Sequence, residues 1–239
     1  MNLQDIAKNF LIEVRQDKSV EELLEQLSIL SFDEMKEQLT DDNQKKAFWI
    51  NIYNAFNIFL LKPNPEIINT QHGRVAHFSS KRITIACQPC TLNFIEHGLL
   101  RISKIRWGRG YLKKPYISPF EKTFRLSKAD SRIHFALNCG AISCPPVRIY
   151  DPEKIENQLE LAAVSFLDSK IAYYADENIV KVSQIFNWYA GDFGGEKGLL
   201  EYLRKYHKIP EDVDPMIIYT LYNWNPSTEL NFNEKRINN

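Results

Sequence analysis

The stretch Lys45–Leu61, KKAFWINIYNAFNIFLL, decides the fold. Apolar side chains fall on almost every side of a helix built from it, which is typical of a helix that is buried all round. The polar residues 40–43 before it supply N-cap side chains, and Pro63 after it cannot continue a helix. We therefore predict a central buried helix over residues 45–61.

The segments around this helix mix helical and strand patterns. Residues 3–40 carry apolar stripes at helical spacing, such as Ile6, Phe10 and Val14, and predict helices. The other predicted elements are a strand at 82–87, a helix at about 92–103, a long loop at 104–128, a strand at 132–137, a helix from Asp151 to about Asp168, a strand at 179–182 and a helix near 197–206.

These patterns predict an α+β fold class, a mostly helical single domain with a central buried helix packed on a small, largely antiparallel sheet. No shift of composition demands two separate domains. We expect residues 1–40 to form an N-terminal helical preface packed on one core domain, residues 41–239.

Charge and composition narrow the range of partners. Lys plus Arg and Asp plus Glu both number 30, so the 239 residues have no formal net charge, and nucleic acid is not an expected partner. No run of about 18 apolar residues occurs and the first residues lack a leader pattern, so we expect a soluble, cytoplasmic protein without a membrane partner. Zero net charge is poor for colloidal solubility and is compatible with a homo-oligomer.

The most informative stretch for chemistry is His134–Cys144, HFALNCGAISC. On a strand, His134 and Asn138 point to one face, with the small Ala136 leaving space between them. A thiol nucleophile needs a base to take its proton and a third group to orient that base, and His134, Cys139 or Cys144 and an asparagine supply such a set. In the alternative interpretation His134 is a core histidine and the cysteines are small buried apolar groups.

Two further sets of polar residues lie on predicted helices. Asn51 and Asn54 share one face of the buried helix, so their amides must reach backbone or a ligand, and the loop at 139–146 is the expected partner. His97 and Arg101 are four residues apart on one helical face, with Glu96 on another side. These three form either a supporting shell for a site or a structural ion pair.

The four cysteines allow one more alternative. Cys87 and Cys90 have the spacing of metal ligands, and with Cys139 and Cys144 they reach the number of a structural zinc site. In a cytoplasmic chain four free thiols without zinc are the preferred expectation, and no cofactor or metal is expected. The aromatic stretch at 186–195 lines a pocket or forms a core corner in which Asp192 is an N-cap, and we favour the corner.

Several of these segments together resemble one family. They are Ala47–Ala55, Thr91–Arg101, His134–Pro146, Phe186–Phe193 and Tyr222–Asn225, which are similar to the family called domain of unknown function 547, DUF547, over roughly residues 41–232. The resemblance implies no settled reaction. It marks as motif positions Trp49, Asn51, Tyr53, Asn54, Glu96, His97, Arg101, His134, Asn138, Cys139 and Cys144, whereas Cys87 and Cys90 are not part of the pattern.

The preferred functional hypothesis is a cysteine- and histidine-dependent hydrolase or acyl-transfer enzyme acting on a small molecule or peptide. Cys139 is the expected nucleophile, because Gly140 lets the backbone turn and present N–H groups as an oxyanion hole. Cys144 precedes two prolines that lack such donors. His134 is the expected base. Asn51 or Asn54 would orient it or hold the loop, and the supporting shell is Glu96, His97, Arg101, Asn138 and Cys144. The alternatives are a non-catalytic binding or scaffolding domain and a zinc-stabilised domain.

Overall fold

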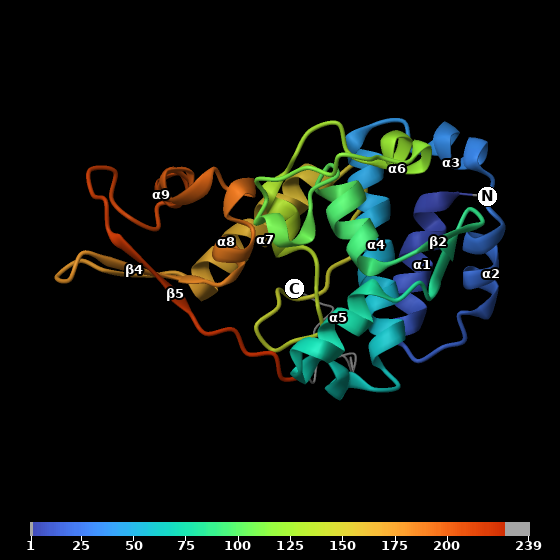
Figure 1. Cartoon of the computed structure of the whole chain (residues 1–239), viewed down its shortest axis with the longest axis horizontal. Coiled ribbons are helices and arrows are strands. Elements are labelled where there is room, and N and C mark those ends of the chain that lie inside the picture. The colour runs from blue at the N-terminus through green and yellow to red at the C-terminus, as the bar shows by residue number, and fades with distance from the viewer. Residues whose placement is uncertain (1, 228–239) are drawn as a thin grey trace.

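The central helix α4, Asp42–Leu61, organises the fold in the computed structural model, which describes residues 2–227. The Asp41 carboxylate caps it by accepting hydrogen bonds from the N–H groups of Asn43 and Gln44 at 2.8 and 2.9 Å. Nearly every side chain from Lys46 to Ile58 is buried. The predicted central buried helix is confirmed, and α4 lies at the middle of one half of the molecule (Figure 1).

Three N-terminal helices gather beside α4. They are α1 (Leu3–Arg15), α2 (Glu21–Ile29) and α3 (Phe32–Gln38). The apolar stripe of α1 packs along α4, with the rings of Phe10 and Phe56 4.8 Å apart. The helical character of residues 3–38 agrees with the sequence, while the division into a preface and a core domain 41–239 stays a prediction.

The segment after α4 consists of short elements. These are η1 (Pro65–Asn69), α5 (Gln71–Ser79), β1 (Ile83–Ile85), β2 (Gln88–Cys90), the π-helix η2 (Phe94–Leu100), η3 (Arg106–Gly108), α6 (Pro119–Phe124) and η4 (Ser131–Phe135). β1 and β2 form an antiparallel hairpin whose turn residues Ala86 and Cys87 have positive φ angles. The segment 104–128, which we expected to be a loop, therefore contains a helical turn and a short helix.

The other half of the molecule is built on a three-stranded sheet. Its elements are α7 (Ile155–Lys170), β3 (Ala172–Tyr174), β4 (Ile179–Ser183), α8 (Ile185–Trp188), η5 (Ala190–Asp192), α9 (Gly195–Lys205) and β5 (Met216–Thr220). The strand order is β3-β4-β5, with β3 antiparallel and β5 parallel to β4. With the hairpin β1–β2, two of the three strand pairs are antiparallel, and the α+β, mostly helical fold class is confirmed.

The predicted strand at 132–137 is wrong. Residues Ser131–Phe135 form the 3₁₀ helix η4, and the Asp130 carboxylate starts it by accepting a hydrogen bond from the Arg132 N–H at 3.1 Å. After η4, the side chain of Asn54 pairs with the carbonyl of Ala136 and the N–H of Asn138. Local capping and a buried amide thus occupy backbone groups that a sheet ladder would need.

Two apolar clusters meet at η4 and α7. Ile133 and Ile155 belong to the cluster around α4, whereas Phe135 and Phe166 belong to the cluster under the three-stranded sheet. His134 lies between Ile133 and Phe135, so η4 places it where the two halves join. Among residues 2–227, no helix is long and apolar enough to cross a membrane.

Candidate functional site

A cavity of about 390 Å³ opens where these two halves join. Its walls are formed by residues of α4, α5, η2, η3, η4, the loop after η4, α8 and the segment after β5. Six of the residues singled out from the sequence line it, namely Tyr53, Glu96, His97, His134, Cys139 and Cys144. The structure therefore gathers the sulfur, imidazole and carboxylate groups of three separate segments around one space.

His134 is held by a carboxylate from the far half of the chain. Its Nε2 lies 2.8 Å from Oδ2 of Asp192, and its ring stacks on Tyr189 with centroids 3.9 Å apart. Burial lowers the pKa of His134 although the hydrogen bond to Asp192 opposes this, so the imidazole is neutral at neutral pH. Nε2 then carries the proton that it donates to Asp192, and Nδ1 carries the lone pair.

Asp192 also binds a buried arginine. Its Oδ2 accepts a second hydrogen bond, from Arg101 Nε at 2.6 Å. Burial opposes ionisation, but His134 and Arg101 outweigh it and hold the pKa of Asp192 well below its usual range. The expected N-cap role of Asp192 is wrong, because α9 begins after Gly194, and no side chain caps it.

The π-helix η2 carries the second acid–base cluster. In its wide turn the Arg101 N–H donates to the Glu96 carbonyl at 2.9 Å, and both Glu96 and His97 of this turn line the cavity. Arg101 Nη1 lies 2.8 Å from His97 Nδ1. Because Arg101 can only donate, the lone pair of His97 is on Nδ1 and its proton is on Nε2.

The surroundings of Glu96 favour its charged form, whereas those of His97 favour its neutral form. Burial lowers the pKa of His97 to about 4, with Glu96 opposing, so the 3.4 Å approach of Glu96 Oε1 to His97 is not an ion pair at neutral pH. Burial opposes ionisation of Glu96, but His97, Arg101 and the Tyr189 hydroxyl, which donates to Oε1 at 2.7 Å, lower its pKa. Glu96 is thus a buried carboxylate, with the Tyr53 hydroxyl 3.4 Å from its other oxygen.

Cys139 and Cys144 form a disulfide in the loop after η4, which corrects the expectation of four free thiols. Both residues are half-buried in the cavity wall, and the Tyr222 hydroxyl lies 3.3 Å from the sulfur of Cys139 and 3.1 Å from that of Cys144. Asn138 closes the loop by donating to the Pro145 carbonyl at 2.6 Å. A spacing of five residues is short enough for both thiols to lie on one turn.

The backbone of this loop does not form the expected oxyanion hole. The N–H of Gly140 donates to Asn138 Oδ1 at 2.7 Å and that of Cys139 to Cys144 Sγ at 3.0 Å. The N–H groups of Ile142 and Ser143, further along the loop, donate to the carbonyls of Asn225 and Asn223. The Tyr222 hydroxyl is a side-chain group within hydrogen-bonding distance of both sulfurs, and burial raises its pKa, so it stays protonated.

The side-chain amides of Asn51 and Asn54 form hydrogen bonds with the backbone. Asn51 pairs with both backbone groups of Tyr150 at 2.7 and 2.9 Å, and Asn54 pairs with Ala136 and Asn138, at 2.9 Å each. Neither side chain lines the cavity. The structure therefore places them as supports of the chain on both sides of Cys139, with no contact to His134 among these bonds.

The structure does not bring the four cysteines together as a zinc site would require. Cys139 and Cys144 are bonded to each other, whereas Cys87 and Cys90 are free in the hairpin β1–β2, outside the cavity. Burial raises the pKa of Cys90 to about 12. Within residues 2–227 no group of three His, Cys, Asp or Glu side chains is placed to hold a metal ion.

Sequence reasoning missed several cavity residues. Asp192, Tyr189 and Tyr222 lie in segments that carried the family resemblance, but nothing in their spacing ties them to His134 or Cys139. The remaining walls are aromatic and basic, and include Arg74, Arg106, Trp107, Arg109, Trp188 and Trp224. Two local signals were available. One is the exposed pair Arg106 and Trp107 in the long basic, aromatic segment, and the other is the stretch at 186–195, for which the pocket alternative that we did not favour is correct at Trp188 and Tyr189.

Comparison with known proteins gives a family and no activity. A family model described as "Protein of unknown function, DUF547" matches residues 36–167, more than half of the chain. No curated protein and no solved structure matches the chain. The matched segment includes α4, η2, η4 and the Cys139–Cys144 loop, and it ends before Asp192 and Tyr222.

Proposed function

The chain belongs to the DUF547 family, and we propose that its cavity is the active site of a thiol-dependent hydrolase or acyl transferase. One observation carries the proposal. His134, whose Nε2 lies 2.8 Å from Asp192 Oδ2, lines the same cavity as Cys139. A histidine that is oriented by a buried carboxylate and shares a cavity with a cysteine has the groups needed to activate a thiol nucleophile.

The chemistry follows from the tautomer of His134. Its Nδ1 takes the proton of the Cys139 thiol while the sulfur attacks the carbonyl carbon of an acyl substrate. The carbon–leaving-group bond then breaks, and the leaving group takes that proton from the imidazolium, which Asp192 stabilises. Water, or another acceptor, attacks the thioester with His134 again as the base, and the acid product and the thiol are released.

The Tyr222 hydroxyl is the proposed oxyanion donor. It lies 3.3 Å from the Cys139 sulfur, and its raised pKa keeps it protonated at neutral pH. After attack by Cys139, the former carbonyl oxygen of the substrate is two bonds from this sulfur. It therefore comes within reach of the Tyr222 hydroxyl. The Nε2–H of His97 is a second donor on the cavity wall.

The disulfide is the resting, inactive form in this proposal. An external thiol such as glutathione or dithiothreitol supplies the two electrons and two protons that convert the bridge to the thiols of Cys139 and Cys144, and is itself oxidised. Asn51, Asn54 and Asn138 are positioning residues, since they hold backbone on both sides of Cys139 and none of the three lines the cavity.

The test is transfer of an acyl group to one sulfur. Protein reduced with dithiothreitol and freed of reductant is mixed with p-nitrophenyl acetate, and release of p-nitrophenolate is followed together with the acyl site by peptide mass. We expect acylation of Cys139 in the wild type and none in Cys139→Ser. Cys144→Ser cannot form the bridge, so it is expected to react without prior reduction.

A binding or scaffolding domain predicts a different result. There the thiols react slowly, and any acyl group appears first on the exposed Cys87. Acylation of Cys87 alone, or equal rates in wild type and Cys139→Ser, would overturn the proposed function.

A further inference from the structure

Three arginines on the cavity wall have no carboxylate partner. Among the described residues, no Asp or Glu oxygen comes within ion-pair distance of Arg74, Arg106 or Arg109, whereas Arg101 and Arg132 each pair with an aspartate. Two of the three are nevertheless held in place by neutral groups. Arg74 donates to the Ile68 carbonyl at 2.7 Å, and Arg109 to the Asn187 side chain at 2.6 Å.

The cavity does not neutralise these charges from within. Of the described residues in its wall, only Glu96 is acidic, and hydroxyl groups and Arg101 already stabilise that carboxylate. Burial lowers the pKa of Arg74, which means that water does not fully solvate this guanidinium. An incompletely solvated, unpaired guanidinium favours an oxyanion, which can accept two parallel hydrogen bonds from it.

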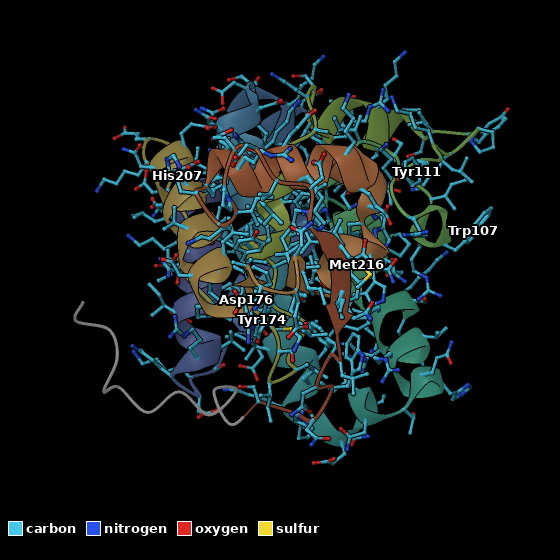
Figure 2. All side chains as sticks on the ribbon, turned by 90° about the vertical axis from the view of Figure 1, so that its left-hand side faces the viewer. Trp107, Tyr111, Tyr174, Asp176, His207 and Met216 are labelled. Carbon is cyan, nitrogen blue, oxygen red and sulfur yellow. A yellow bond between two sulfur atoms is a disulfide. The ribbon has the colours of Figure 1, made fainter. Side chains whose placement is uncertain are left out.

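Flat aromatic surfaces lie beside the arginines. The guanidinium of Arg74 sits 4.3 Å from the ring centroid of Trp224, and Trp224 stacks on Trp188 with centroids 5.6 Å apart. Trp107, next to Arg106, is 74% exposed and projects from the same edge of the molecule as Tyr111 (Figure 2). An exposed tryptophan next to an arginine without a carboxylate partner forms a two-part site. The ring can stack on a ligand while the guanidinium binds a charge on the same ligand.

From these contacts we infer the substrate class of the cavity. It is a small acyl compound that carries an oxyanion, as a carboxylate or a phosphate, on a flat apolar group. The arginines bind the oxyanion and the tryptophans stack on the flat group. The inference rests on the proposed function, because it names the substrate of that same site, and a volume of about 390 Å³ suits a small molecule.

The test uses the oxidised wild-type protein, in which the bridged sulfurs cannot be acylated. Tryptophan fluorescence is titrated with four probes that share one ring system, 2-naphthoate, 2-naphthyl phosphate, 2-naphthalenemethanol and 2-naphthylmethylamine. We expect at least one anion to bind about tenfold or more tightly than the alcohol and the amine, and added salt to weaken it. The tighter of the two anions identifies carboxylate or phosphate as the recognised group.

Variants at the cavity mouth locate the binding. Arg106 is exposed and makes no hydrogen bond to a described residue, so Arg106→Gln is expected to fold and to weaken the anion about fivefold or more, an effect of the size of one charge-assisted hydrogen bond. Trp107→Ala weakens all four probes. Lys36→Gln, which removes one charge from the exposed face of α3, leaves binding unchanged.

The outcomes separate this inference from the proposed function. Equal binding of anion, alcohol and amine, or no binding of any probe, overturns the inference even if Cys139 is acylated in the reduced protein. Tight binding of an anion that Arg106→Gln weakens supports the inference even if Cys139 proves inert. In that case the proposed function fails and the cavity is a binding site for the same chemical class.

Discussion

Asp192 lies 58 residues after His134 in the chain, yet its Oδ2 accepts the hydrogen bond of the His134 imidazole at 2.8 Å. The contact joins η4 on one side to η5 on the other and crosses the boundary between the two apolar clusters. The same oxygen binds Arg101. One carboxylate oxygen thus fixes the tautomer of the histidine and neutralises a buried cation.

Replacing Asp192 tests this relationship. Asp192→Asn keeps the shape but can donate to His134 Nε2, which favours the tautomer with its proton on Nδ1. We expect acylation of Cys139 by p-nitrophenyl acetate to fall roughly 10²-fold or more. Urea unfolding is expected to show a loss of about 3 kcal/mol, because the buried Arg101 loses its anion.

Asp176→Asn is the matched control. Asp176 is exposed in the turn between β3 and β4, near the middle of the view in which Trp107 lies at the right edge (Figure 2). Its replacement is expected to leave the acylation rate and the stability unchanged. Equal acylation rates in Asp192→Asn and Asp176→Asn would remove Asp192 from the account.

Tyr222 separates two kinds of reaction at the same sulfur. Tyr222→Phe keeps the ring, which packs against Trp188 and Trp224, and removes the hydroxyl beside both sulfurs. Acylation forms an oxyanion and is expected to slow by roughly 10²-fold, whereas alkylation by iodoacetamide forms none and is expected to change little. Equal slowing of both reactions contradicts the oxyanion role, and Tyr116→Phe, at a 92% exposed site, is the control.

Asn54 supports the fold, and its removal is expected to appear in stability. Asn54→Ala leaves the carbonyl of Ala136 and the N–H of Asn138 buried without their partner. The free energy of unfolding in urea should fall by about 2–4 kcal/mol. Asn64→Ala removes an exposed amide that caps no helix, and should change stability by less than about 0.5 kcal/mol. Similar losses of stability in both variants would contradict a stabilising role for the Asn54 hydrogen bonds.

Acid should destabilise the fold first through its histidines. Burial lowers the pKa of His77 and of His97 to about 4, and lowers that of His134, whereas an unfolded histidine titrates near about 6.5. The unfolded chain therefore binds more protons than the folded one in this range, so stability falls as pH drops from about 6.5 towards about 4. Urea unfolding measured at several pH values checks this, and constant stability over that range would contradict it.

The helical core could be predicted from the sequence because its signals are local. The cap at Asp41, the apolar run of α4 and the stripe of α1 act within a few turns of chain, and the structure has each of them. The segment at 131–135 has the alternating pattern of a strand but forms η4, because Asp130 and the distant Asn54 take its backbone groups. The alternation of apolar and polar residues does not show that Asp130 and Asn54 bind this backbone.

The site was predictable in part for the same reason. Glu96, His97, His134, Cys139 and Cys144 stand out by residue type and do line one cavity. Tyr222 reaches that cavity, and Asp192 reaches His134 in its wall, through the folding of the three-stranded half, over separations of 83 and 58 residues. The π-helical form of the segment that carries Glu96 and His97 is not predicted by a helical spacing of 3.6 residues.

The most direct measurement of the central claim is the alkylation rate of each cysteine in the reduced protein at neutral pH. Iodoacetamide labelling is followed by peptide mass, with exposed Cys87 and buried Cys90 as internal references. Activation by His134 predicts that Cys139 reacts about tenfold or more faster than Cys87, and that His134→Asn abolishes this advantage. A Cys139 that reacts no faster than Cys87, or equally fast without His134, would contradict it.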